Sequence, residues 1–151
     1  MLENKGEFAR KNAGRIVGIA LVLLLVLLAL VKAFGGGEKN ADSTEKRLAF
    51  LQELGWDCGA ESERRAQVKI PDCSSGAMKE YNKLMLRGGY DLSAYSGKTL
   101  EQYRYEIENY PDCNQTVYVI LYVSGGRVVG GDIHTEALNG FMHELRARET
   151  E

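Results

Sequence analysis

The chain of 151 residues has few of the residues that mark a metal or catalytic framework, with only three cysteines, two histidines and two prolines. It contains no C-x-x-C or H-x-x-x-H spacing, which excludes the common zinc frameworks. It also has no G-x-S-x-G nucleophile elbow, and no P-loop lysine follows its paired glycines. The composition excludes a disordered chain, a collagen-like chain, a multi-pass membrane protein and a polybasic nucleic-acid binder. We therefore expect neither an enzyme nor a bound cofactor.

One long apolar run stands near the N-terminus. Residues 16–31 contain no charged or strongly polar side chain, and Arg15 and Lys32 flank them. A helix over residues 13–34 would be about 33 Å long, enough to cross the roughly 30 Å hydrocarbon core of a bilayer. The small-x-small sites after the run are poor cleavage sites, which favours an anchor over a cleaved signal peptide. We therefore predict a transmembrane helix at residues 13–34.

The charges on either side of this run predict its orientation. Residues 1–34 hold five basic and two acidic side chains, whereas residues 35–151 hold 14 basic and 19 acidic ones. The positive-inside rule places residues 1–12 in the cytoplasm and the bulk of the chain outside the cell membrane. Residues 35–42 read as a glycine-rich linker before an extracytoplasmic domain at residues 43–151. The acidic charge of this domain argues against anionic lipid or an anionic wall polymer as its partner.

Hydrophobic periodicity predicts two clear helices in the outer domain. Leu48, Leu51 and Leu54 form an apolar stripe over residues 43–54, which follow a capping box at Asp42 and end at Gly55. A second helix is expected between Ser74 or Ser75 and Gly88, and a weakly patterned third over residues 135–147. Strands are expected at residues 66–70, 99–109, 116–123 and 127–134. The predicted fold class is α+β, with an antiparallel sheet of three to four strands packed by two or three helices.

Several short strings occur together in one known family. They are FLQELGW at 50–56, IP at 70–71, YNKL at 81–84, GYDLSAYSGK at 89–98, YRYEIENYP at 103–111, VVGGDI at 128–133 and NGFMHEL at 139–145. In order and spacing, they resemble a Gram-positive bacterial family known only as domain of unknown function four-eight-three-zero. The resemblance covers residues 44–145 and implies a bacterial envelope protein behind a single N-terminal anchor. It implies no activity, because the family has no assigned catalytic residues.

Cysteines and tyrosines are the first candidate site residues. An aspartate precedes each cysteine, and because a neighbouring carboxylate disfavours the thiolate, a nucleophilic role is not expected. Cys73 and Cys113 both follow Pro-Asp at a turn, so one disulfide between them is an open alternative to free thiols. All eight tyrosines lie between positions 81 and 122. A partner surface is predicted at Tyr90, Tyr95, Tyr103 and Tyr105, with core packing of these rings as the alternative.

The pattern D-x-H-x-E offers a second candidate site. Asp132, His134 and Glu136 alternate, so a strand would place all three on one face, where they could bind a divalent metal. A solvated strand edge has the same sequence. The leading functional hypothesis is a membrane-anchored interaction or sensing module that binds an envelope protein, a peptide or a wall component. The alternatives are a metal-assisted envelope enzyme that uses these three residues, and a structural subunit of an envelope complex.

Overall fold

The computed structural model describes residues 40–146, together with Val22. Apart from Val22, the predicted transmembrane segment at residues 13–34 lies outside the described residues, as do residues 1–12 and the first part of the linker. In the part of the chain that the structure describes, no helix is both long and apolar enough to span a bilayer. The second of two compact units, residues 38–151, contains the helices and strands described below.

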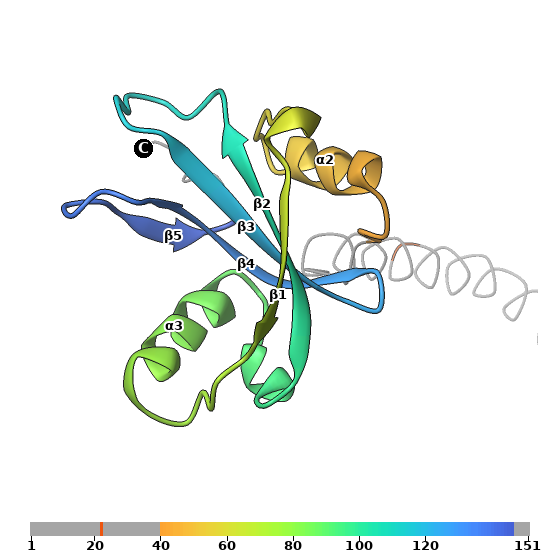
Figure 1. Cartoon of the computed structure of the whole chain (residues 1–151), viewed down its shortest axis with the longest axis vertical. Helices are drawn as coiled ribbons and strands as arrows, with labels where there is room; N and C mark the ends of the chain where they lie inside the picture. Colours follow the sequence, from red (N-terminus) through yellow and green to blue (C-terminus); the bar gives the residue numbers. More distant parts are fainter. Residues whose placement is uncertain (1–21, 23–39, 147–151) are drawn as a thin grey trace, which may run out of the picture. The chain divides into compact units, whose positions relative to one another are not determined.

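Within residues 40–146, five strands form one antiparallel sheet in the order β1-β2-β3-β4-β5, so that consecutive strands are neighbours (Figure 1). Their bounds are Arg64–Lys69 for β1, Thr99–Ile107 for β2, Val117–Ser124 for β3, Arg127–Thr135 for β4 and Met142–Glu144 for β5. Gly125 and Gly126 join β3 to β4 with φ values of 56° and 76°. Both central positions of a type I′ turn need positive φ, which glycine adopts without strain.

Two α-helices pack on opposite faces of this sheet, α2 at Thr44–Glu53 and α3 at Gly76–Arg87. Phe50 and Leu51 of α2 pack in one cluster with Tyr103 and Tyr105 of β2. On the other face, Leu84 and Met85 of α3 pack with a different set of sheet residues, Leu100, Tyr122 and Val129. Successive side chains of a strand point to opposite faces, so these two clusters are two core layers with the sheet between them. We call the two sides the α2 face and the α3 face.

The connections contain two short 3₁₀ helices. The first, η1, spans Ala60–Ser62 and leads into β1, and the second, η2, spans Leu92–Tyr95 and lies between α3 and β2. Asp91 begins η2 because its side chain accepts a hydrogen bond from the backbone N–H of Ser93 at 2.9 Å. The connection at residues 90–98 is therefore partly helical.

The α+β class is confirmed, but the strand count and the C-terminal helix were predicted wrongly. The sheet has five strands rather than three or four, and Met142–Glu144 pair with β4 where a helix over residues 135–147 was expected. His143 and Leu145 are buried while Met142 is exposed, which is the period of two of a strand. Helix α2 begins after Ser43, whose Oγ accepts from the backbone N–H of Lys46, and not at a capping box on Asp42.

A β-bulge in β4 decides which face its polar residues occupy. Val123 pairs with Val128, but Tyr122 pairs with Gly130, so Val129 is the extra residue. Because of this extra residue, the side chains after it change faces, and Asp132 points to the α3 face. Next to it, Gly131 lies so close to β3 that a Cβ atom would stand 2.3 Å from the carbonyl oxygen of Ile120. Glycine at this position allows the two strands to approach.

Candidate functional site

A buried carboxylate on the α3 face joins two elements. Asp132 of β4 is 1% exposed, and its Oδ1 lies 2.7 Å from Nδ1 of His134, two positions further along the strand. Its Oδ2 accepts a hydrogen bond from the hydroxyl of Tyr81 on α3. A buried charge is stable only when it is paired and hydrogen-bonded, and these two donors meet that need. We call Asp132, His134, Tyr81 and Tyr122 the Asp132 cluster.

Two tyrosines complete the Asp132 cluster on its covered side. The hydroxyls of Tyr81 and Tyr122 are 3.2 Å apart, and their rings meet edge to face at a centroid distance of 6.4 Å. Burial, and then the negative charge of Asp132, raise the pKa of the Tyr81 hydroxyl far above its usual value. Tyr81 therefore stays neutral and keeps the proton that it donates to Asp132.

His134 forms the outer side of the cluster. Its side chain is 14% exposed, and its Nδ1 is occupied by Asp132. In the neutral imidazole with the proton on Nδ1, Nε2 is a hydrogen-bond acceptor, and among the described residues it has no partner. A carboxylate that fixes the tautomer and orientation of an imidazole in this way prepares Nε2 to receive a donor.

Past Asp132 toward the C-terminal end of β4, the residues on the α3 face are only partly buried. Tyr118, His134 and Met142 lie side by side on β3, β4 and β5 in the row after Ile120, Asp132 and Glu144. Tyr118 and His134 are half-buried, and Met142 is 49% exposed. The guanidinium of Arg104 lies 4.6 Å from the centroid of the Tyr118 ring. We call the exposed side of Arg104, Tyr118, His134, Glu136 and Met142 the open strip.

The three side chains of the D-x-H-x-E pattern do not form a metal site. Asp132 and His134 share a face, as their alternation predicts, but they bond to each other. Strand β4 ends at Thr135, and Glu136 bonds instead to Arg104, with Oε1 2.7 Å from Nη1. Among the described residues, no group of three His, Cys, Asp or Glu side chains is arranged to hold a metal ion. The geometry thus gives an oriented imidazole rather than a three-ligand set.

The predicted tyrosine surface is divided between the two faces of the sheet. Tyr103 and Tyr105 are 5% and 0% exposed because α2 covers them, so the expectation that they line a partner surface is corrected. Tyr90 and Tyr95 are half-buried and pack against the α3-side core. Lys98 places its Nζ 5.2 Å from the centroid of the Tyr95 ring. Core packing, the alternative reading, describes Tyr103 and Tyr105.

All three cysteines are free thiols. Cys73 is buried in the α3-side cluster, whereas Cys113 packs against the α2-side cluster. Of the two alternatives left open, a Cys73–Cys113 disulfide or free thiols, the structure has free thiols. Cys58 is half-buried near two carboxylates. Burial, and then the charges of Glu108 and Asp57, raise the pKa of its thiol to about 12. A thiol in this setting stays protonated at neutral pH and is a poor nucleophile.

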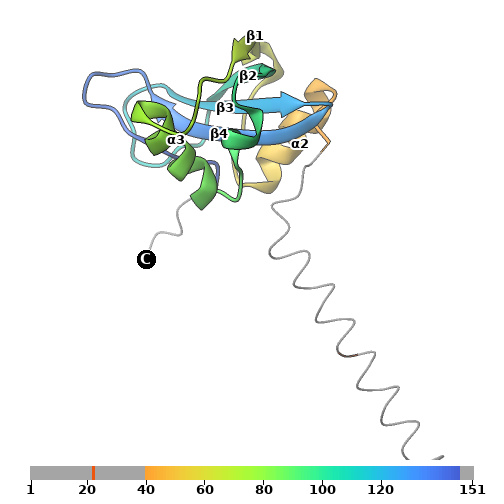
Figure 2. The same ribbon diagram turned by 90° about the horizontal axis from the view of Figure 1, so that it is seen from below.

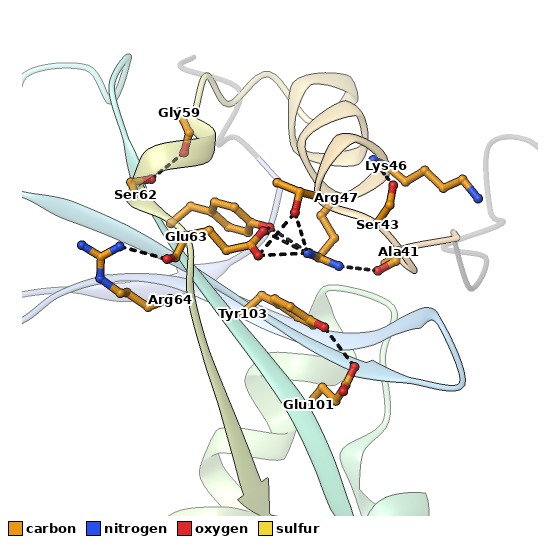
Figure 3. Close-up of polar contacts among 12 residues, drawn as sticks. Ala41, Ser43, Lys46, Arg47, Gly59, Ser62, Glu63, Arg64, Glu101 and Tyr103 are labelled. Atoms are coloured by element: carbon orange, nitrogen blue, oxygen red, sulfur yellow. Dashed lines mark hydrogen bonds and ion pairs between the residues drawn. The ribbon is translucent and has the colours of Figure 1, made fainter.

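A second polar cluster, on the α2 face, surrounds Arg47 (Figure 3). Arg47 is 4% exposed, and its Nη2 lies 2.9 Å from Oε2 of Glu63. Its Nη1 donates to the backbone carbonyl of Ala41 at 2.9 Å. Each of the three guanidinium nitrogens, Nε, Nη1 and Nη2, donates a hydrogen bond to a protein oxygen. Helix α2 covers the cluster. We assign it a structural role.

A groove of about 350 Å³ runs beside α2, and its lining is acidic. Its residues are Glu45, Leu48, Ala49, Gln52, Trp56, Asp57, Cys58, Gly59 and Glu108. The lining contains three carboxylates and no basic side chain. Acidic residues alone do not define a site, and we assign the groove no ligand.

Three residues of the candidate site, Tyr81, Arg104 and Met142, were not indicated by the sequence. Tyr81 reads as part of an apolar helix face, and its hydroxyl reaches Asp132 only because the bulge turns that residue toward α3. Arg104 and Tyr118 belong to different strands and meet only through sheet register. The polar residues at alternate positions of β2, Gln102, Arg104 and Glu106, were the available signal for a polar row on this face.

No family model matches the chain, and no curated protein and no solved structure matches it significantly. The functional argument therefore rests on the geometry of the Asp132 cluster and the open strip.

Proposed function

We propose that the chain is a single-pass envelope protein whose outer domain binds a peptide segment of another envelope protein. In this proposal, residues 13–34 are the anchor, residues 1–12 lie in the cytoplasm, residues 35–42 are the linker and residues 43–151 face outward. The apolar run and the charges around it support this arrangement. The resemblance to the Gram-positive family agrees with it.

The observation that carries the proposal is the oriented imidazole on the open strip. Asp132 accepts a hydrogen bond from Nδ1 of His134 and so fixes the orientation of the ring. In the neutral imidazole, Nε2 is then an acceptor in a fixed position for an incoming N–H group. Tyr118 and Met142 flank His134 in the same row and supply apolar area for a side chain. A peptide provides both kinds of group close together, since each residue carries a backbone N–H beside a side chain. Aromatic rings and methionine are enriched at such binding surfaces.

Binding rather than catalysis is proposed because of how the carboxylates are used. Both carboxylate oxygens of Asp132 accept hydrogen bonds from protein groups, and Glu136 forms an ion pair with Arg104. We propose no cofactor and no metal for this module.

Site-specific photo-crosslinking in intact cells tests the binding surface. A photo-reactive amino acid replaces Tyr118 in the full chain, and a matched variant carries it at Lys79, an exposed position on α3. We expect a protein adduct from position 118 that His134→Ala abolishes, and none from position 79. The proposal is overturned if position 118 gives no adduct, or if the adduct persists in the His134→Ala background.

The orientation has its own test. A membrane-impermeant maleimide is applied to cells that express Lys79→Cys or Asn12→Cys in a chain whose native cysteines are serine. We expect Lys79→Cys to react in intact cells, and Asn12→Cys to react only after the membrane is permeabilised. The reverse pattern would place the domain in the cytoplasm and contradict the proposal.

A further inference from the structure

Strand β1 is one edge of the sheet, at the opposite end of the strand order from β5. It pairs with β2 along its whole length, from Arg64 to Lys69, and has no strand on its other side in the described part of the chain. Figure 2 shows it at the upper margin of the sheet. Five of its six residues are exposed and the sixth is half-buried. The edge is therefore open to a partner.

The hydrogen bonds next to β1 show which backbone groups face outward. The N–H of Ile70 donates to the carbonyl of Lys98, and the carbonyl of Ile70 accepts from Gly97. Backbone groups of an antiparallel strand alternate in direction, so those of the even-numbered residues point toward β2. The N–H and C=O groups of Arg65, Gln67 and Lys69 consequently point away from the sheet. Three donors and three acceptors stand in a row along this edge.

The side chains of this edge are basic. Arg64, Arg65 and Lys69 are all exposed, and β1 contains no acidic residue, although the chain as a whole has a net charge of −2. Glu101, on the neighbouring strand β2, forms an ion pair with Arg65. Lys69 has no ion pair among the described residues, and Arg64 bonds only to the backbone carbonyls of Glu61 and Glu63. The strand therefore keeps positive charge for a partner.

A second copy of β1 fits this edge poorly. In the antiparallel register that sets the outward-facing Gln67 opposite Gln67 of the other copy, Arg65 of each copy would stand opposite Lys69 of the other. Like charges directly opposite each other destabilise a strand pair. Acidic side chains at the same positions would form ion pairs instead.

We propose that β1 binds an acidic segment of a partner protein as an added sixth strand. The outward N–H and C=O groups of Arg65, Gln67 and Lys69 form the hydrogen bonds to the added strand. The basic side chains select glutamate or aspartate at alternate positions of the partner. Main-chain hydrogen bonds give affinity in this mode of recognition, and side chains give specificity. The inference is independent of the proposed function, since it rests on the outward backbone groups and basic side chains of β1 and not on the Asp132–His134 pair.

The test uses the full chain in detergent micelles and a probe peptide of alternating glutamate and valine. Binding is followed by fluorescence anisotropy, and amide hydrogen exchange reports which backbone groups are covered. We expect the peptide to slow exchange at Arg65, Gln67 and Lys69 and to leave the amides beside His134 unchanged. A peptide of alternating lysine and valine serves as the charge control and should not bind.

Two variants separate strand addition from simple charge attraction. Gln67→Pro removes an outward N–H without breaking a bond to β2, because proline is tolerated on an edge strand where the N–H faces solvent. We expect it to weaken binding at least about tenfold, which corresponds to 1.4 kcal/mol, whereas Gln67→Thr keeps the affinity within about twofold. Lys69→Glu should also weaken binding, and thermal unfolding checks that each variant is folded. The proposal is overturned if Gln67→Pro binds like the parent, if the lysine peptide binds equally well, or if exchange slows elsewhere instead.

Discussion

Arg47 of α2 donates a hydrogen bond from Nε to the hydroxyl of Tyr105 on β2, at 2.8 Å and across 58 positions of the chain. The same guanidinium pairs with Glu63 and lies 3.6 Å from the centroid of the Tyr103 ring. One side chain thus connects the helix to β2 and to the residue before β1. Since α2 is the one α-helix that packs on this face in the described part of the chain, this contact holds the helix against that core layer.

Replacing Arg47 by methionine should destabilise the domain strongly. The variant keeps a long apolar stem but leaves Glu63 half-buried without its cation, and the loss of one partner of a buried pair costs about 3–5 kcal/mol. Urea unfolding of the full chain in detergent, followed by tryptophan fluorescence, measures the change. The neighbouring Lys46→Met is the matched control, because Lys46 makes only an exposed pair with Asp42 and should shift the free energy of unfolding by less than about 1 kcal/mol. Equal losses in the two variants would contradict the role given to Arg47.

The lowered pKa of Glu63 should make the free energy of unfolding depend on pH. Burial raises the pKa of its carboxyl, but the hydrogen bonds from Tyr105 and Arg47 lower it by more, and the net pKa lies below the ordinary value of 4.5. The unfolded chain therefore takes up this proton at a higher pH than the folded chain. The stabilising contribution is complete above about pH 4.5 and is lost as the pH falls through the lower, folded-state value.

The expected result is a free energy of unfolding that falls in acid with a smaller slope in Glu63→Gln than in the parent. Urea titrations at a series of pH values measure the slope. Glu80→Gln is the control, because Glu80 makes only an exposed pair with Lys83. If Glu63→Gln leaves the slope unchanged while Glu80→Gln reduces it, the assignment to Glu63 is wrong.

Tyr81→Phe tests the Asp132 cluster without opening a cavity. The change removes one of the two donors to Asp132, and a hydrogen bond to a charged group contributes about 1.5–3 kcal/mol. Tyr95→Phe is the matched control on the same face. Among the described residues, the contact recorded for the Tyr95 side chain is that of Lys98 with its ring and no hydrogen bond of its hydroxyl, so loss of the hydroxyl should cost less than about 0.5 kcal/mol. A Tyr81→Phe variant as stable as Tyr95→Phe would show that Asp132 does not need this donor.

Local patterns were enough to predict most elements of the fold. The leucine spacing of α2 and the alternation of β2 each place the right residues on one face, and Gly55 and Gly125 end their elements by their backbone freedom. Strand β5 was missed because three residues carry too little periodicity to distinguish a strand from a helix turn. Its identity comes from pairing with β4, a contact that the local sequence does not contain.

The site was harder to predict than the fold because it depends on register. Alternation correctly places Tyr103 and Tyr105 on one face of β2, but only the position of α2 makes that face the buried one. Asp132 and His134 were identified as neighbours on one face, yet their partner Tyr81 depends on the bulge at Val129. Such a one-residue shift reverses every side chain that follows it. The paired glycines Gly130 and Gly131 indicate a bulge as one interpretation of this strand, but they do not decide which residue is the extra one.

The alkylation rate of the Cys58 thiol reports whether solvent reaches the α2 side of the domain. With a thiol pKa of about 12, its thiolate fraction at pH 8 is about a thousandfold below that of an ordinary thiol, whose pKa is near 9. We expect alkylation by iodoacetamide, followed by mass spectrometry of each cysteine, to be slow in the folded full chain and to reach the ordinary rate in urea. Because burial is the largest cause and the charges of Asp57 and Glu108 come after it, Asp57→Asn should speed the reaction only modestly in the folded protein. A Cys58 that reacts equally fast with and without urea would mean that this thiol is open to solvent, and that the layer between α2 and the Trp56 loop is not closed.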